Sequence, residues 1–287
     1  MFWLWCARVA WVLLPVTAGG ALADAISGWP VGPSRTATVM LWIAWSVGLL
    51  ALLAPRPVGC TLLRVVAPVA VVCAVGSITS ATTASSIVAV ASTVAAAALA
   101  LSAPVVTAAG NALAYGDEQR FPLRIPTVLL LGPVPLAVAA IAAGVTVGPL
   151  LLADADILAG AVLTAAGLPL AFFVFRALHA LSPRWLVIVP AGLTFVDPLT
   201  LGEPTLVRRE EIEGVARVPA APVQGALDLR LGTIVGGVVV ALTEPVPFAR
   251  RRGRSRADLV ETRIVVVALA RPGVLLALAR SRRLKTR

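Results

Sequence analysis

The chain has 287 residues, 59% of them hydrophobic, and a mean hydropathy of +0.94. This composition is typical of membrane proteins and sets the chain apart from ordinary soluble globular proteins. The formal net charge is +10 and the pI is about 11.3. Such a balance can indicate nucleic-acid binding, but in a membrane protein basic residues more simply fix topology and face anionic lipid.

Charge is concentrated towards the C-terminus. Residues 1–182 contain seven Arg and five acidic residues, whereas residues 183–287 contain sixteen Arg, one Lys and nine acidic residues. The near absence of Lys, with abundant Ala, Gly and Pro, indicates a GC-rich bacterial genome. The change in charge falls within 172–185, where helical periodicity gives way to a strand-like pattern. We therefore predict a transmembrane domain at 1–181 and a cytoplasmic β-rich domain at 182–287.

Six apolar segments are long enough to cross a bilayer, which takes about 20 helical residues. They lie at about 2–23, 37–54, 61–78, 84–103, 126–146 and 157–178. The first ends in Ala21-Leu22-Ala23, which resembles a signal-peptidase site, so a cleaved signal peptide is an alternative to a first span. The start lacks a basic region and is rich in Trp, which argues against cleavage. The loop at 78–84 is uncharged, so a fused or re-entrant pair of segments is a second alternative.

Basic residues recur at every second loop. They lie at the second loop, the fourth loop and the final exit (Arg56 and Arg64; Arg120 and Arg124; Arg176 and Arg184). The positive-inside rule places these loops in the cytoplasm. The sequence therefore predicts a six-helix α-helical polytopic bundle in the plasma (inner) membrane, with the N- and C-termini cytoplasmic.

Proline interrupts several predicted spans, at Pro15, Pro68, Pro133, Pro135 and Pro169. Each proline removes a backbone donor and favours a kink. Broken helices can form transport sites, so a small-solute transporter or channel with a regulatory cytoplasmic domain is an alternative function. Proline is also simply frequent in membrane helices.

The fourth loop is the sizeable cytoplasmic loop among the helices. It combines an acidic pair, two arginines and two aromatic residues: Tyr115, Asp117, Glu118, Arg120, Phe121 and Arg124. We predict either a docking loop for the C-terminal domain or a partner, or a solvated loop that obeys the positive-inside rule.

Past residue 182 the pattern is that of short strands followed by one helix. Strict alternation at 227–231 marks a half-buried strand, and Pro272 suits a first helical turn. The expected strands lie at 185–189, 193–196, 206–218 (one or two), 227–231, 238–242 and 262–269. We predict a small β-meander or barrel of six or seven strands, capped by a C-terminal helix.

The strongest electrostatic feature is a cluster of five arginines: Arg250, Arg251, Arg252, Arg254 and Arg256. Five arginines in seven residues cannot be buried, so we predict a loop. Tethered near a membrane, such a cluster gains about 1 kcal/mol per residue from anionic lipid headgroups. A partner protein or a second copy of the chain is another candidate partner, and a solvated loop without a ligand is the plainer interpretation. Nucleic acid is disfavoured, because no aromatic residues are interleaved with the arginines.

No pattern for catalysis, a cofactor or a metal is present in the sequence. Cys6, Cys60 and Cys73 are dispersed, and His179 is the single histidine. A lone histidine at a helix end more often complements the helix dipole than binds a metal. We therefore predict a non-enzymatic membrane protein whose β domain is an interaction module for anionic lipid or a partner protein.

The C-terminal pattern also resembles bacterial pleckstrin-homology-like domains over residues 184–283. The likeness lies in the opening strand at 185–189, the turn at Pro190-Ala191-Gly192, and a final Val-rich strand followed by a Pro-started helix. The whole chain resembles a family of multi-pass membrane proteins from high-GC bacteria, in Tyr115–Pro126, Gly148–Ala153 and Arg184–Leu201. This resemblance implies architecture; the family brings no established activity.

Overall fold

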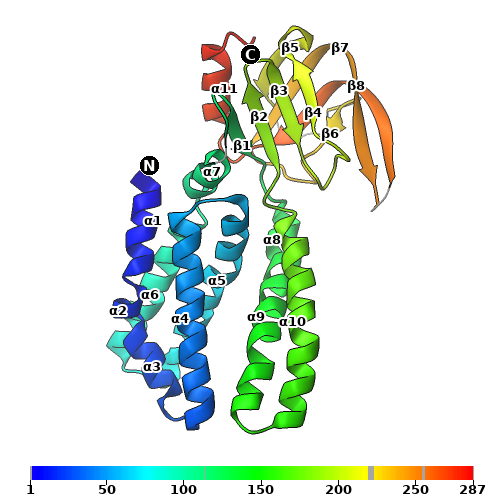
Figure 1. Cartoon of the computed structure of the whole chain (residues 1–287). Coiled ribbons are helices and arrows are strands. Elements are labelled where there is room, and N and C mark those ends of the chain that lie inside the picture. Colours follow the sequence, from blue (N-terminus) through cyan, green and yellow to red (C-terminus); the bar gives the residue numbers. More distant parts are fainter. Residues whose placement is uncertain (1, 113, 219–222, 254–255, 287) are drawn as a thin grey trace. The chain divides into compact units, whose positions relative to one another are not determined.

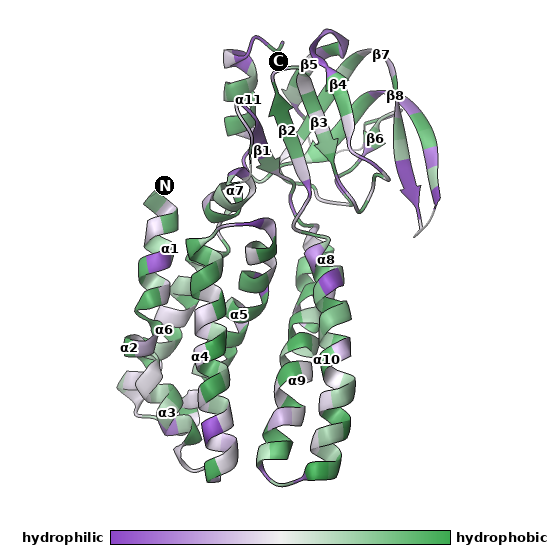
Figure 2. Cartoon of the chain, viewed as in Figure 1, coloured by the Kyte–Doolittle hydropathy of each residue, from purple (hydrophilic) through white to green (hydrophobic). Residues whose placement is uncertain are grey.

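A computed structural model describes residues 2–112, 114–218, 223–253 and 256–286 (Figure 1). The chain forms two compact units. One, here called the helical unit, comprises Met1–Ala109 and Val134–His179. The other, the β unit, comprises Gly110–Pro133 and Ala180–Arg287. Figure 2 shows the long helices coloured mostly as hydrophobic.

Helices make up the first part of the chain. They are α1 (Phe2–Val12), α2 (Leu14–Thr17), α3 (Gly19–Ser27), α4 (Val31–Leu53), α5 (Pro57–Gly76), η1 (Ser77–Thr79), α6 (Thr83–Ala100), α7 (Ala103–Asn111), α8 (Thr127–Leu131), α9 (Pro133–Ala153) and α10 (Ile157–His179). Within the described residues, five helical segments are long and apolar enough to cross a membrane: Val31–Leu53, Pro57–Thr79, Thr83–Ala100, Thr127–Ala153 and Ile157–His179. The chain therefore has a helical, membrane-type part followed by a β domain.

The N-terminal segment, predicted as one helix over 2–23, is divided into α1, α2 and α3. The cause is Pro15, which has no N–H to donate to the carbonyl of Trp11. The indole N–H of Trp45 donates to that carbonyl instead, at 2.9 Å. The indole of Trp11 in turn donates to the carbonyl of Trp45, also at 2.9 Å. This reciprocal pair, here called the Trp clasp, satisfies the broken turn and joins it to α4.

Small and charged residues fit α1 against α4. Trp11 is buried over Gly48, where a Cβ atom would overlap the indole ring. Arg8 donates to the carbonyl of Leu52 at 3.1 Å and lies 4.9 Å from the ring centroid of Trp5. A guanidinium at a helix C-terminus satisfies carbonyls that have no intrahelical donor and complements the helix dipole. The N-terminal end of α1 therefore packs beside the C-terminal end of α4.

Helices α9 and α10 form an antiparallel pair built on glycine. A Cβ atom on Gly144 would meet the backbone of Gly167, one on Gly148 would meet Thr164, and one on Gly160 would meet Leu152. Small residues let helix backbones approach closely where no hydrophobic driving force exists between helices in lipid. The spacing of these glycines thus brings the two helices into backbone contact.

The described part of the β unit has eight strands and a C-terminal helix. The elements are β1 (Gln119–Pro122), β2 (Trp185–Val189), β3 (Gly192–Val196), β4 (Thr205–Arg208), η2 (Arg209–Glu211), β5 (Ile212–Arg217), β6 (Leu227–Asp228), β7 (Gly237–Arg252), β8 (Arg256–Ala268) and α11 (Pro272–Ser281). One sheet has the order β1-β2-β3-β4, and the other has the order β5-β7-β8-β6, in which β6 and β8 are parallel. Single bridges from Leu123 to Leu269 and from Leu201 to Arg250 join the two sheets.

Strand β1 comes from the loop between the membrane-type helices. Gln119 pairs with Ile188 and Pro122 with Trp185, so β1 is the edge strand beside β2. The β unit consequently includes residues 110–133, which the sequence analysis placed within a continuous domain 1–181. The pairing is favoured because it buries Phe121 and completes the first sheet.

A continuous apolar core lies between the two sheets. It contains Phe195 and Phe248, whose rings meet edge to face at 5.6 Å, together with the β-branched residues of β7 and β8. Helix α11 adds Leu275, Leu276 and Ala279 to this core. The amide of Val215 in β5 donates to Lys285 at 2.8 Å, which ties the segment after α11 to the second sheet.

Two strand predictions and one loop prediction need correction. The strand expected at 227–231 is limited to Leu227–Asp228, because Arg230 turns back to pair with Asp228. The strand expected at 238–242 continues through a bulge to Arg252. The arginine cluster was predicted to be a loop, but Arg250, Arg251 and Arg252 belong to β7 and Arg256 to β8. A hairpin end accommodates them because its side chains remain in solvent.

Candidate functional site

The predicted docking loop is spread over the edge of the β unit. Phe121 is buried in the core, and Tyr115 is exposed. The carbonyl of Asp117 accepts a hydrogen bond from Arg282 after α11. Arg124 is fixed by two bonds to the end of β8, from its amide to Ala268 at 2.8 Å and from its Nε to Leu269 at 3.1 Å. The loop therefore does not present these residues as one exposed surface.

Glu118 and Arg120 form a local ion pair, with 2.6 Å between Oε1 and Nε. The hydrogen bond from Arg120 holds the pKa of the Glu118 carboxyl below its usual value. The backbone of Arg120 is also held by the side chain of Asn111, at 2.9 Å and 2.8 Å. These contacts stabilise the turn that leads into β1.

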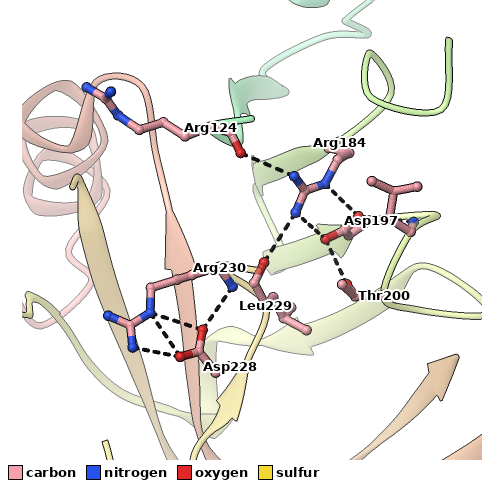
Figure 3. A network of polar contacts seen from close by, with 8 residues as sticks. Arg124, Arg184, Asp197, Thr200, Asp228, Leu229 and Arg230 are labelled. Atoms are coloured by element: carbon pink, nitrogen blue, oxygen red, sulfur yellow. Dashed lines mark hydrogen bonds and ion pairs between the residues drawn. The ribbon is translucent and has the colours of Figure 1, made fainter. Parts of the chain in front are cut away.

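The β unit contains a buried ion pair between Arg184 and Asp197 (Figure 3). Arg184 follows α10 in the chain and also bonds to Arg124, which precedes α8. Arg184 and Asp197 make a bidentate pair at 2.8 Å for both bonds, and each side chain is 1% exposed. Arg184 also donates to the carbonyls of Arg124 and Leu229, both at 3.2 Å. Arg184 was interpreted from sequence as a marker of the membrane interface; the structure instead buries it inside the β unit.

Asp197 has further partners of its own. It accepts from the hydroxyl of Thr200 at 2.7 Å and from the amide of Leu199 at 3.1 Å. A buried charge requires this kind of compensation, since an unpaired one is strongly destabilising. We call Arg184, Asp197, Thr200 and the carbonyls of Arg124 and Leu229 the Arg184 network.

A second ion pair, Asp228 with Arg230, lies next to this network (Figure 3). The Nη2–Oδ2 distance is 2.6 Å, and the amide of Arg230 donates to Asp228 Oδ1 at 2.9 Å. Burial alone would raise the pKa of Asp228, but the hydrogen bonds and charge of Arg230 lower it overall. The same hydrogen bond raises the pKa of Arg230. Neither group is thus suited to proton exchange near neutral pH.

The end of the β7–β8 hairpin carries the predicted basic cluster. Arg250, Arg251, Arg252 and Arg256 are exposed there, while Arg254 lies outside the described residues. Among the described residues of this cluster, Arg252 alone has an ion pair, with Asp258 at 3.1 Å, and both side chains are largely solvated. We call the described arginines the basic hairpin end.

The basic hairpin end is held at its base. Phe248 is fully buried, the amide of Arg251 donates to the carbonyl of Thr200 at 2.8 Å, and that of Gly202 donates to Ala249 at 2.7 Å. Because Thr200 also bonds Asp197, the hairpin is connected to the Arg184 network. Figure 1 shows β7 and β8 extending beyond the other strands of the β unit.

The helical unit contains a cavity of about 340 Å³ beside the Trp clasp. Its lining is mostly apolar and comes from α1 to α6, including Pro15, Trp42, Ala70 and Thr93. The volume lies at the lower end of the range for small-molecule sites, about 300–1,000 Å³. Pro15, where the N-terminal helical segment is broken, is among the lining residues.

His179 has a structural environment. Its Nδ1 lies 2.8 Å from the hydroxyl of Thr61, and its ring stacks on Phe175 at 6.5 Å. Across the described ranges, no three His, Cys, Asp or Glu residues gather as a metal site would require. The hydrogen bond joins α10 to α5 within the helical unit.

Comparisons with protein-family models, with curated proteins and with solved structures found no match. Sequence reasoning missed the Arg184 network because Arg184 and Asp197 are 13 positions apart and neither lies in a recognisable motif. It predicted a turn at 232–237, but not the exposure of Leu231, Ile234 and Val235 in and beside that turn.

Proposed function

We propose that this protein is a membrane-anchored interaction module. The helical unit serves as a six-crossing anchor in the inner membrane of a bacterium, with both termini cytoplasmic. The β unit binds anionic lipid headgroups of the cytoplasmic leaflet through the basic hairpin end. The single observation that carries this proposal is the exposure of Arg250, Arg251 and Arg256 on a hairpin whose base is fixed in the core.

The contacts of α1 to α3 support a sixth crossing. Arg8 in α1 bonds the C-terminal end of α4, while α3 packs against η1, which follows the far end of α5. The three short helices together therefore extend from one end of the bundle to the other. Each is too short to cross a bilayer alone, but as a continuous series they match the length of the neighbouring helices.

The arrangement of the β unit supports a pleckstrin-homology-like interpretation. Two four-stranded sheets pack around one core, and a C-terminal helix contributes to it. Two features depart from the simple meander expected from the sequence: β1 precedes the α9–α10 pair, and β6 runs parallel to β8. We also propose that the chain belongs to a family of multi-pass membrane proteins from high-GC bacteria.

Electrostatics favour lipid as the ligand of the basic hairpin end. Each basic residue near an anionic bilayer contributes about 1 kcal/mol, and a domain tethered to the membrane needs no diffusional search. Arginine also forms bidentate hydrogen bonds with phosphate. The backbone of Arg250 and Arg256 is held in the paired strands β7 and β8, so little backbone freedom is lost when they bind.

The test uses the full chain in nanodiscs, because a fragment beginning at residue 182 would lack β1. Hydrogen–deuterium exchange of the segment 249–260 is compared in phosphatidylcholine and in an equal mixture with phosphatidylglycerol. We expect slower exchange in the anionic discs, and loss of this difference at high salt or in the variant Arg250→Gln/Arg251→Gln/Arg256→Gln.

The matched control is Arg208→Gln/Arg209→Gln/Arg217→Gln, which makes the same change in charge on exposed arginines around β4 and β5. It should keep the response to anionic lipid. Equal exchange in the two lipids, or an equal loss in the control, would remove the basic hairpin end from lipid binding.

A second candidate function is favoured by the cavity beside the Trp clasp: a small-solute transporter or channel regulated by the β unit. If the cavity lies on a permeation path, Ala70→Phe should abolish solute flux in proteoliposomes, since Ala70 lines it. The control is Val72→Phe, on the same helix but 69% exposed. Equal flux in wild type and Ala70→Phe would argue against transport through this space.

A further inference from the structure

The segment that follows Arg230 exposes a compact set of apolar side chains. Leu231 is 42% exposed, Ile234 66% and Val235 57%. Single exposed apolar side chains are common on protein surfaces, whereas several that adjoin one another can mark an interaction site. We call residues 231–235 the apolar loop.

The conformation of the apolar loop is fixed at both ends. Leu231, Gly232 and Gly236 have φ angles of 53°, 83° and 79°. The amide of Thr233 donates to the carbonyl of Arg230 at 3.1 Å. At Gly236 a Cβ atom would overlap the carbonyl of Leu269, so glycine is required there on steric grounds as well. The outward direction of Ile234 and Val235 therefore follows from a defined turn.

Both ends of the apolar loop are hydrogen-bonded to the chain connections that lead to the α9–α10 pair. Before the loop, the carbonyl of Leu229 accepts from Arg184 at 3.2 Å, just ahead of β2 (Figure 3). After it, the carbonyl of Gly236 accepts from Leu269 at 2.8 Å, and the carbonyl of Leu269 accepts from Arg124 at 3.1 Å. The candidate span Thr127–Ala153 begins directly after Arg124.

The apolar loop lies near the start of a candidate membrane span. Three residues of extended chain reach at most about 10 Å, so Arg124 lies close to the point at which Thr127 starts the span. The apolar loop, bonded through Leu269 to Arg124, is on the same part of the β unit. With the span Thr127–Ala153 in the bilayer, as the proposed function has it, the surroundings of the apolar loop are the headgroups and the acyl boundary. Small apolar groups gain free energy at that boundary.

We infer that the apolar loop inserts into the headgroup and acyl boundary of the bilayer and holds the β unit against it. The inference depends on apolar contact and on the bonds to Arg124 and Arg184. It does not require the arginines of the basic hairpin end. It therefore predicts contact with zwitterionic as well as anionic lipid.

The test is photo-crosslinking of the full chain, with benzoylphenylalanine introduced at position 234 in nanodiscs. Adducts are identified by mass spectrometry. We expect lipid adducts at position 234 in phosphatidylcholine discs. The matched position is Ala191, which is exposed in the turn between β2 and β3, at the opposite end of β2 from Arg184. Lipid adducts should be absent there.

Two results would overturn the inference. One is a yield of lipid adducts at position 234 no greater than at position 191. The other is crosslinking of position 234 to a second copy of the chain in place of lipid. Because position 234 is already exposed, the substitution should not prevent folding; the double variant Ile234→Asp/Val235→Asp provides a second readout, since it should increase hydrogen exchange of residues 229–237 in discs.

The outcome is separable from that of the proposed function. Lipid adducts at position 234 with no anionic-lipid effect on segment 249–260 would support insertion of the apolar loop and contradict the role of the basic hairpin end. Protection of that segment without adducts at position 234 would support the basic hairpin end and contradict insertion of the apolar loop.

Discussion

At the scale of single residues, Arg184 combines several contacts in one side chain. It neutralises Asp197 and binds the backbone at Arg124 and Leu229, so one guanidinium joins the chain before α8 to the chain after α10. Planar, multidentate geometry explains why arginine suits this position. Lysine would provide one ammonium group and could not reach all three partners in the same way.

We predict that Asp197→Asn will destabilise the β unit by about 3–5 kcal/mol, because it leaves the guanidinium of Arg184 buried without its counter-charge. Unfolding can be followed by the fluorescence of Trp185, the single Trp in the part of the sequence after residue 45. Its signal is isolated in a soluble version that joins residues 110–126 through a Gly/Ser linker to 181–287, because this version contains no other tryptophan. The control Asp258→Asn, in an exposed pair, should change stability by less than about 1 kcal/mol.

Asp228 gives a prediction about acid stability. Its pKa in the folded protein is lowered, below the unfolded value of about 3.9. The ionised carboxylate therefore stabilises the fold above that value, and this contribution is lost as the pH falls through the folded pKa. Asp228→Asn should lower the melting temperature at pH 6 and flatten its decline between pH 5 and pH 3. Since Asp228 is 41% exposed, solvent weakens the effect.

The control for Asp228→Asn is Glu261→Gln on the exposed side of β8. It should leave the slope of melting temperature against pH close to that of the wild type. A wild-type slope in Asp228→Asn itself would show that the pair with Arg230 contributes nothing to acid stability.

At the scale of elements, the α1–α3 series shows how a membrane protein tolerates a proline. The Trp clasp supplies a donor from another helix, and Gly48 makes room for the indole that forms it. In hydrocarbon an unsatisfied carbonyl costs several kcal/mol. The break at Pro15 is therefore tolerated because the indole of Trp45 donates to the carbonyl of Trp11.

We predict that Gly48→Ala will destabilise the helical unit by roughly 1–3 kcal/mol, the usual cost of overpacking. The added methyl group would displace Trp11 and with it both indole hydrogen bonds. Thermal unfolding in detergent micelles measures the effect. Gly20→Ala is the matched control, since nothing lies within 4 Å of a Cβ atom there, and it should be neutral or slightly stabilising. Equal melting temperatures for Gly48→Ala and wild type would refute the role of close packing.

At the scale of the whole molecule, the β unit is assembled from two separate parts of the chain. Its edge strand β1 lies before the α9–α10 pair and the remaining strands lie after it. Phe121 and Leu123 from the first part are buried with residues of the second. The β unit is thus completed by a segment that a boundary at residue 182 would exclude.

We predict that residues 182–287 alone will aggregate, because the edge of β2 and the core under Phe121 would be exposed. A soluble version with residues 110–126 joined through a Gly/Ser linker to 181–287 should be monomeric and cooperatively folded. Size-exclusion chromatography and circular dichroism can compare the two. Phe121→Ala in the joined version should restore the aggregation. A stable monomer from 182–287 would show that β1 is dispensable.

The sequence was sufficient to predict those elements whose structure depends on neighbouring residues in the chain. Long apolar runs predicted the five candidate spans, and the patterns at 185–189 and 193–196 predicted β2 and β3. It was insufficient where the deciding contact is distant. The four-residue strand β1 contains Pro122 and has no periodicity of its own, so its pairing with β2 cannot be seen locally. The kink at Pro15 could be predicted from the proline itself, but the hydrogen bond from Trp45 that satisfies the broken turn could not. The burial of Arg184 likewise depends on Asp197.

The position of β1 also has a consequence for biosynthesis. Translation delivers β1 first, then the whole of α8, α9 and α10, and only afterwards its partner β2. Until β2 has been synthesised, β1 has no strand to pair with. The β unit can therefore close only after α9 and α10 have been synthesised. Under the proposed function, the surface that binds lipid would form only once the last hairpin of the helical unit has left the ribosome.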